Sequence, residues 1–210
     1  MRVKVCGNTA VGTALAAVEA GADMLGFIMA PGSARSLTVE RARDIVRELP
    51  SSVDAVGVFV DRPRAEVEEV AAEAGFTAVQ LHGRESWEDF AELPIPVIKA
   101  ARMESAQSAA LVAWPPGALL LADAHVPGKA GGTGTTFPWE WVADLALRYR
   151  LLVSGGLSGA NVAAAVAAVR PWGVDASSRL ESSPGSKDVD QVRLFVKEAR
   201  RAEAALVAHA

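Results

Sequence analysis

Eight short apolar runs, separated by longer segments with helical periodicity, limit the folds open to this chain more than any other feature. Each run is rich in Val, Leu, Ile or Ala and is largely apolar on consecutive positions. Continuous apolarity is typical of strands that are buried on both faces, as in parallel sheets. The runs cover residues 3–6, 24–29, 55–60, 78–81, 96–99, 118–122, 151–153 and 173–175.

Segments whose apolar residues recur with a period of about 3.6 residues lie between these runs. Thr38 is a candidate N-cap followed by Glu40 in the first turn, while Gly21 and Gly75 stand where a helix would end. About eight strand–helix units result, which predicts a parallel sheet with right-handed crossovers. The expected helices cover residues 9–20, 38–49, 64–74, 86–93, 104–114, 138–149, 158–169 and 188–208.

Two closures of such a sheet are possible: a doubly wound open sheet and a (β/α)8 barrel. No Gly-x-Gly-x-x-Gly turn follows the first run, where a dinucleotide-binding sheet would carry it. No stretch is rich enough in Gly, Ser or Pro to divide the chain. We therefore predict an α/β fold of the TIM-barrel type, a single (β/α)8 domain over residues 1–210, with short loops for its class.

Composition excludes several classes of function. The 21 Lys and Arg residues against 25 Asp and Glu argue against nucleic acid as a partner, which usually requires a basic face. The single cysteine excludes a disulfide framework, and three scattered histidines do not suggest a metal site. The start of the chain lacks the apolar core of a signal peptide, and no run could span a membrane. We expect a cytoplasmic protein and, with five tryptophans scattered along the chain, a monomer.

The carboxyl ends of the strands should carry the functional residues, because active sites of such barrels lie there. After the seventh run, Gly155 and Gly156 would let the backbone approach an anion, and after the eighth run Ser177 and Ser178 would add hydroxyl donors. Loops after strands 7 and 8 form the usual phosphate cradle of these barrels. A pair of plain tight turns is the alternative.

Two further strand ends carry groups suited to proton transfer. Cys6 ends the first run and Asp123 ends a very apolar run, where a lone carboxylate would be costly to bury. Together they suggest an acid–base pair across the barrel mouth. A buried inert cysteine and a helix-capping aspartate are the alternative interpretations. The guanidinium group of Arg35 could bind a carboxylate through two parallel hydrogen bonds. His82 is either a structural histidine or a site residue.

Taken together, these motifs resemble those of the phosphoribosylanthranilate isomerase family, whose members are (β/α)8 enzymes of tryptophan biosynthesis. The resemblance spans essentially the whole chain, and its motifs occur in the family's order. They are Val3-Lys4-Val5-Cys6-Gly7, Gly21 to Phe27, Val56 to Val60, Val79-Gln80-Leu81-His82-Gly83, Gly131 to Gly134, Ser154-Gly155-Gly156-Leu157, Val174 to Ser178 and Glu181 to Gly185.

This resemblance implies an Amadori rearrangement of N-(5-phosphoribosyl)anthranilate, an aminoaldose, to an aminoketose, without cofactor or metal. Cys6 would be the general base, Asp123 the general acid, and Arg35 the partner of the anthranilate carboxylate. We expect activation of the Cys6 thiol, since a thiol of ordinary pKa is mostly protonated at neutral pH. Asp123 would need to be held protonated, which an apolar strand end favours. The residues expected to face the phosphoribosyl ligand are Arg35, His82, Gly155, Gly156, Asp175, Ser177, Ser178 and Arg179.

The sequence departs from the family pattern at three places. Asn8 follows the Cys-Gly pair where the family has an apolar residue, and Thr135 stands where the glycine-rich segment at residues 127–136, a candidate lid, usually has lysine. Arg179 replaces a glycine of the eighth loop. This arginine could obstruct a phosphate or could add a charge-assisted contact to it.

Two other functions stay open. One is a phosphosugar isomerase or epimerase with a different aglycone, which would keep the phosphate loops but need not keep Arg35. The other is a phosphate-ligand binder that has lost turnover, which the presence of both Cys6 and Asp123 argues against. A bifunctional barrel that also converts the related aminoaldose of the histidine pathway is disfavoured. That substrate carries two phosphates and would need a second phosphate-binding cradle.

Overall fold

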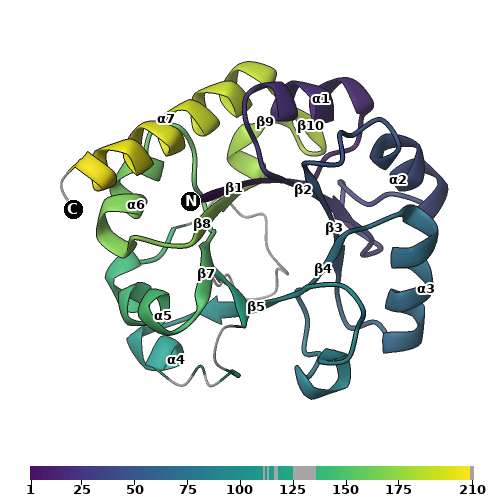
Figure 1. The fold of residues 1–210 in the computed structure, drawn as a ribbon, viewed down its shortest axis with the longest axis horizontal. Coiled ribbons are helices and arrows are strands. Elements are labelled where there is room, and N and C mark those ends of the chain that lie inside the picture. The colour runs from purple at the N-terminus through teal and green to yellow at the C-terminus, as the bar shows by residue number, and fades with distance from the viewer. Residues whose placement is uncertain (111, 113, 116–117, 125–135, 209–210) are drawn as a thin grey trace.

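Eight parallel strands close into a barrel with the order β1-β2-β3-β4-β5-β6-β7-β8, and helices surround it (Figure 1). The structure is a computed structural model that describes residues 1–110, 112, 114–115, 118–124 and 136–208. The predicted fold class is confirmed. The strands are β1 Arg2–Cys6, β2 Met24–Ile28, β3 Asp54–Phe59, β4 Ala78–Leu81, β5 Val97–Met103, β6 Leu119–Ala124, β7 Arg150–Val153 and β8 Gly173–Ala176.

The helices follow the strands in the predicted order. Thr38 is the N-cap of α2 and accepts a hydrogen bond from the Arg41 amide, and Gly75 ends α3 in the left-handed conformation. The α-helices are α1 Val11–Glu19, α2 Val39–Val46, α3 Arg64–Ala74, α4 Ala106–Ala110, α5 Ala143–Arg148, α6 Val162–Val169 and α7 Val189–Ala208. Short 3-10 turns are η1 Glu88–Phe90, η2 Trp139–Val142 and η3 Ser178–Leu180.

Two of the predicted helices differ in kind from the structure, and the helix predicted at residues 104–114 is assigned only over Ala106–Ala110. The helix expected at residues 86–93 is only the 3-10 turn η1, and the one expected at 138–149 is divided into η2 and α5. Ser86-Trp87-Glu88-Asp89 offers a helix start, but Pro94 and Pro96 follow shortly after Phe90 and leave no room to propagate a helix.

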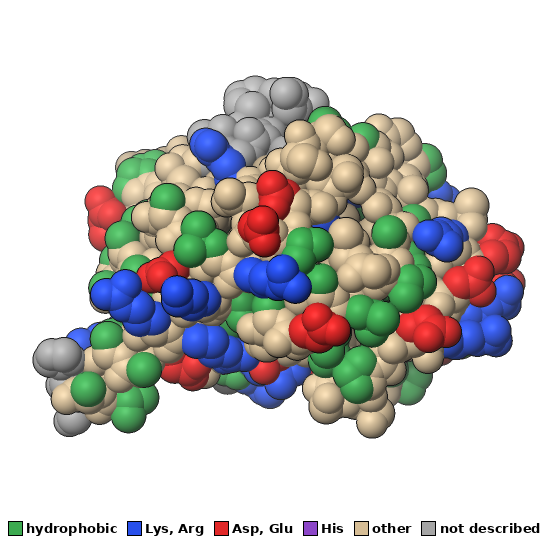
Figure 2. All heavy atoms as spheres, turned by 90° about the horizontal axis from the view of Figure 1, so that it is seen from above, with side chains coloured by type: hydrophobic (Ala, Val, Ile, Leu, Met, Phe, Trp, Pro, Cys, Tyr) green, Lys and Arg blue, Asp and Glu red, His purple; other side chains and the backbone are tan. Residues whose placement is uncertain are grey.

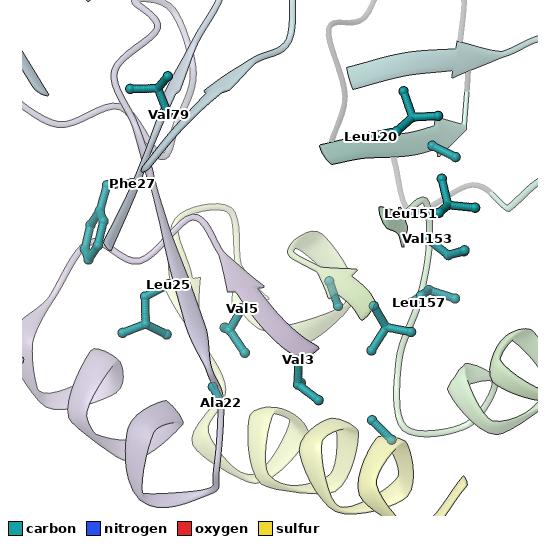
Figure 3. Packing of buried hydrophobic residues seen from close by; sticks show 14 of the residues in the cluster. Val3, Val5, Ala22, Leu25, Phe27, Val79, Leu120, Leu151, Val153 and Leu157 are labelled. Carbon is teal, nitrogen blue, oxygen red and sulfur yellow. The ribbon is translucent and has the colours of Figure 1, made fainter. Parts of the chain in front are cut away.

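Alternation along each strand divides the core into two layers. Val3 and Val5 on β1 point outward and pack with residues of the covering helices, as Figure 3 shows for β1 and β2. Lys4 and Cys6, which alternate with them, point into the barrel. A smaller apolar cluster fills the barrel interior. It consists of Met24, Val56, Ala78, Ile98, Ala100, Leu121 and Leu152.

A small hairpin, β9 Glu181–Ser183 and β10 Ser186–Lys187, follows β8 and η3. It lies beside β1 and α1 (Figure 1) and was not predicted from the sequence. Its turn contains Pro184 and Gly185, and Gly185 has a φ of 85°. The hairpin carries Glu181 and Lys187 back toward the carboxyl end of β1, where both take part in the site described below.

The surface carries both signs of charge. On the face seen in Figure 2, Lys and Arg side chains are interspersed with Asp and Glu. This distribution is consistent with the slightly acidic balance of the sequence. Within the described residues, no helix combines the length and apolarity that crossing a membrane would require.

Candidate active site

A cavity of about 520 Å³ opens at the carboxyl ends of the strands. This is a typical size for a small-molecule site, at the end of the barrel where such sites lie. Every site residue predicted from the sequence lines it. They are Cys6, Arg35, His82, Asp123, Gly155, Gly156, Asp175, Ser177, Ser178 and Arg179.

The Cys6 thiol lies at the end of β1 and is nearly buried, with a residue exposure of 6%. Gly26 on the neighbouring strand makes room for it, because a Cβ at that glycine would lie 2.5 Å from Sγ. Burial raises the pKa of the thiol, Lys4 and Lys187 lower it, and Asp175 raises it, with a net rise. The expected activation of this thiol is therefore not met, because desolvation outweighs the two ammonium groups.

Lys4 lies two residues before Cys6 and is fully buried inside the barrel. Its Nζ donates to Asp175 Oδ1 at 2.9 Å, and Ser154 Oγ donates to Asp175 Oδ2 at 3.0 Å. Burial lowers the pKa of Lys4, but the charges of Asp175 and Cys6 raise it by more than burial lowers it. The net shift is upward. Asp175 faces the cavity as predicted, with both of its oxygens already engaged by the protein.

Arg35 forms a bidentate ion pair with Glu181 of the hairpin. Its Nε and Nη2 each donate to one carboxylate oxygen at 2.7 Å. Lys187 Nζ donates to the same carboxylate at 2.8 Å and to the Ser177 carbonyl at 3.0 Å. Burial raises the pKa of Glu181, but these hydrogen bonds reverse the effect and leave it lowered. The sequence offered no protein partner for Arg35, and the structure supplies one.

Asp123 at the end of β6 takes part in a chain of side chains that crosses the cavity wall. His82 Nε2 lies 3.2 Å from Asp123 Oδ2, and Gln80 Nε2 lies 2.9 Å from His82 Nδ1. An amide nitrogen only donates, so with this orientation of Gln80 the imidazole proton lies on Nε2 and points at Asp123. Asp123 Oδ1 accepts the amide hydrogen bond of Ala124 at 3.0 Å. His82 thus orients the carboxylate.

The two loops predicted to bind phosphate form one corner of the cavity. Gly155 and Gly156 have φ values of 86° and 62°, a conformation that favours glycine, and a Cβ at Gly155 would meet the Ala124 amide at 2.8 Å. Ser177 Oγ is buried and has no hydrogen-bond partner among the described residues. A buried hydroxyl without a partner is costly, so it favours a ligand group at this corner.

Arg179, the residue that replaces a family glycine, lies in η3 and is exposed at the cavity edge. Asp61 and Arg170 are the non-glycine residues with positive φ in the described part of the chain, and Arg179 is not one of them. The backbone therefore needs no glycine here, and the substitution carries no dihedral strain.

The other two departures from the family pattern lie elsewhere. Asn8 is fully buried, and its Nδ2 donates to the carbonyls of Val5 at 2.8 Å and Gly26 at 3.3 Å, which joins the ends of β1 and β2. Thr135 and residues 127–135 of the predicted lid lie outside the described residues.

Sequence reasoning missed five residues that shape this site: Lys4, Gly26, Gln80, Glu181 and Lys187. All of them except Lys187 stood within motifs of the family resemblance, and Lys4 and Gln80 stood at strand positions that alternate with outward-facing residues. That alternation was the available signal for both, since a charged residue two positions before Cys6 on a buried strand has to face the barrel interior. Nothing local marks Glu181 or Lys187 as buried.

An eight-stranded parallel barrel with a thiol, a carboxylate and two glycines lining a cavity at its carboxyl end has the architecture of the (β/α)8 enzymes, whose active sites lie at this end. A sequence model of the N-(5′-phosphoribosyl)anthranilate isomerase family matches residues 3–198. The chain belongs to this family.

Individual relatives are similar to this chain over nearly its whole length. The N-(5′-phosphoribosyl)anthranilate isomerase of Pelobacter propionicus is 42% identical over 95% of this chain and 96% of its own. A structure of monomers generated from the dimeric phosphoribosylanthranilate isomerase of Thermotoga maritima has a TM-score of 0.87 at 37% identity, covering 96% of this chain and 99% of that one. A phosphoribosylanthranilate isomerase in complex with reduced 1-(o-carboxyphenylamino)-1-deoxyribulose 5-phosphate has a TM-score of 0.83 at 37% identity, with the same coverage.

Proposed function

We propose that this chain isomerises N-(5′-phosphoribosyl)anthranilate by general acid–base catalysis, with Cys6 as the base and Asp123 as the acid. The observation that carries the proposal is the common cavity. It presents a thiol from β1 and a carboxylate from β6, between an arginine and the glycine-lined corner. The complex of a relative with a reduced product analogue supports a ligand of this chemical class.

Asp123 opens the ribose ring in this proposal. Its proton goes to the ring oxygen, the C1′–O bond breaks, and the anthranilate nitrogen forms a protonated imine with C1′. His82 holds the carboxyl group in place through Nε2. The positive charge of the imine makes the adjacent C2′ hydrogen acidic, which prepares the second step.

Cys6 then removes the C2′ proton as a thiolate. The electron pair forms the C1′–C2′ double bond and neutralises the imine nitrogen, and the resulting enolamine tautomerises to the aminoketose. Cys6 now holds a proton that Asp123 lacks, and exchange with solvent restores both groups. Because burial raises the pKa of the thiol, kcat/KM should increase with pH as Cys6 ionises.

The remaining site residues bind the two ends of the substrate. Arg35 is proposed to share its guanidinium between Glu181 and the anthranilate carboxylate. The phosphate is proposed to lie against the backbone of Gly155 and Gly156 and the hydroxyls of two serines, Ser177 and Ser178. Arg179 adds a charge from the cavity edge. Asp175 lies at the cavity wall and is proposed to act through Lys4.

The test is turnover of substrate generated in the assay from anthranilate and phosphoribosyl pyrophosphate by a coupling transferase. We expect the wild type to consume this fluorescent substrate, and Cys6→Ala and Asp123→Asn each to lower kcat by at least about 10²-fold with an unchanged fold. Arg179→Met should raise KM if the charge holds phosphate. A folded wild type without turnover would refute the proposal.

Full activity of Arg35→Ala would instead indicate a phosphosugar isomerase with a different aglycone. Binding of the substrate without turnover, in a wild type that is folded by circular dichroism, would indicate a binding protein. Each outcome is read against the same assay with a relative of known activity as the positive control.

Two further expectations, on the oligomeric state and on the cellular compartment, belong to this proposal. We propose that the protein works as a monomer in the cytoplasm, the compartment where a cofactor-independent biosynthetic isomerase meets its substrate. The Thermotoga maritima relative is a dimer, so sedimentation velocity on the purified protein tests the monomer directly. Cell fractionation tests the compartment.

A further inference from the structure

Lys4 carries a fully buried charge in the barrel, and the acid–base scheme above assigns it no step of the reaction. Its side chain is fully buried, and it lies in register with Asp175 on β8. The 2.9 Å hydrogen bond to Asp175 Oδ1 fixes Nζ in the barrel interior. Because residues two apart on a strand face the same side, Nζ and the Cys6 thiol share this interior. The charge of Lys4 lowers the pKa of the thiol, and the charge of Cys6 raises the pKa of Lys4.

The charged groups around Cys6 come from five parts of the fold. Lys4 comes from β1, Asp175 from β8, Lys187 from β10, and Arg35 from the loop after β2; Glu181 on β9 binds the last two. Among the described residues that these contacts bring together, three cations face two carboxylates. One positive charge is left over, and a thiolate at Cys6 would balance it.

We propose that Lys4 is a positioning residue for the general base: its ammonium group, held in place by Asp175, is the counter-ion that stabilises Cys6 as a thiolate. This inference rests on the proposed function only in calling Cys6 the base. A thiolate in a buried site requires a nearby cation, since desolvation alone favours the neutral thiol. Lys4 acts on the reaction through Cys6 and needs no contact with substrate.

The signs of the neighbouring charges make the proposal specific. Lys4 and Lys187 favour the thiolate, and Asp175 opposes it. Lys4→Met keeps the volume of the side chain and removes the charge, so it should raise the pKa of the Cys6 thiol. Asp175→Asn keeps the shape and removes the opposing charge, so the ammonium group pairs with the thiol alone and the pKa should fall.

The experiment titrates the thiol directly in the intact protein. Cys6 is the only cysteine of the 210-residue chain, so thiolate absorbance in the ultraviolet and the rate of alkylation by iodoacetamide report on this group alone. We expect the apparent pKa to rise by about one unit or more in Lys4→Met, which is a roughly tenfold lower thiolate fraction at a fixed pH below it. In Asp175→Asn we expect it to fall.

A purely structural role for Lys4 would give a different pattern. Both variants would then lose stability in urea unfolding while the thiol pKa stayed at the wild-type value or moved in the same direction in both. Either result would overturn the proposal. If Lys4→Met does not fold, Asp175→Asn decides the question, since a pKa at or above the wild-type value contradicts the proposal on its own.

Kinetics separate this inference from the proposed function. The thiol titration requires no substrate, so its result stands even if the chain does not turn over phosphoribosylanthranilate. With turnover, Lys4→Met should shift the acidic limb of the kcat/KM profile to higher pH by the same amount as the thiol titration, and Lys4→Arg should restore it in part. An unshifted limb would contradict the proposal.

Discussion

Gly26 determines where the sulfur of Cys6 can lie. A Cβ at position 26 would be 2.5 Å from Sγ and 3.1 Å from the Cα of Cys6, and the second contact is with backbone that cannot rotate away. β1 and β2 are hydrogen-bonded neighbours, with Cys6 opposite Gly26. A methyl group there must therefore displace the thiol or separate the two strands.

We predict that Gly26→Ala lowers kcat by about 10²-fold, because a base displaced by roughly an ångström no longer reaches its proton. The substrate assay checks this, with thermal unfolding to show that the barrel persists. The matched control is Gly12→Ala on α1, where a Cβ meets nothing within 4 Å. That variant should keep full activity and gain about 0.5–1 kcal/mol of stability. Equal activity of the two variants would refute the assignment.

Individual residues also show where sequence reasoning stops. Cys6, Asp123 and Gly155 could be predicted because each stands at the end of an apolar run, and the fold class says that such ends meet. Glu181 and Lys187 could not, because no strand alternation marks them, and a buried charge and a solvated one then look alike in a sequence. The rise in the pKa of the Cys6 thiol was missed for the same reason, since it depends on the burial of its surroundings.

Among the elements, the β9–β10 hairpin has the least sequence signal and a large effect on the site. Its strands are short and polar, and only Pro184-Gly185 marks a turn. Yet Glu181 joins the hairpin to Arg35, and Lys187 joins it to the Ser177 carbonyl. The hairpin is therefore held to the barrel by buried ion pairs rather than by an apolar face.

We predict that Glu181→Gln destabilises the protein by about 1–3 kcal/mol at neutral pH, because charge-assisted hydrogen bonds to Arg35 and Lys187 are lost. The lowered pKa of Glu181 sets the pH dependence. Its carboxylate stabilises the fold above the pKa of the unfolded chain, and this contribution disappears as the pH falls through the lower folded-state pKa.

Urea unfolding of both proteins at about pH 7 and at about pH 3 measures this difference, which should shrink in acid. The control is Glu66→Gln, a half-buried carboxylate paired with Arg62, which should cost less than about 0.5 kcal/mol at either pH. A difference between wild type and Glu181→Gln that does not change with pH would show that the carboxylate charge has no part in holding the hairpin.

The other elements differ in how far their own residues predict where they begin and end. α3 has the predicted bounds, since Gly75 ends it in a conformation that favours glycine. β5 extends to Met103, beyond the predicted end at residue 99, because pairing with β6 continues through Arg102 and Met103. Polar residues such as Arg102 carry no strand signal of their own, and the neighbouring strand decides their conformation.

At the largest scale, α7 contacts the segments that lead into β1 and β2, at the face of the barrel opposite the site. Arg200 on α7 donates to the carbonyls of Met1 at 2.7 Å and Gly21 at 2.8 Å, and forms an ion pair with Asp23 at 2.6 Å. The last helix thereby holds the first strand and the start of β2. Residues at this face of a (β/α)8 barrel contribute to stability rather than to catalysis.

We predict that Arg200→Ala lowers the free energy of unfolding by about 1–3 kcal/mol and leaves kcat and KM unchanged. Chemical unfolding and the substrate assay check the two parts separately. The neighbouring Arg201 is the matched control, since it is largely exposed and forms one ion pair at 3.4 Å with Glu198. Its alanine variant should change stability by no more than about 0.5 kcal/mol. A loss of activity in Arg200→Ala would contradict this separation of the two faces.

The pattern of apolar runs and strand ends was enough to predict the architecture and the rim of the cavity. Eight buried runs between helical segments have few ways to satisfy their backbone hydrogen bonds, and a closed parallel barrel is one of them. Strand ends then identify the rim residues. Only the tertiary structure decided which side chains pair: Lys4 with Asp175, Arg35 with Glu181, and His82 with Asp123. These partners are far apart in the chain, and closing the barrel brings them together in a buried interior where an unpaired charge would be costly.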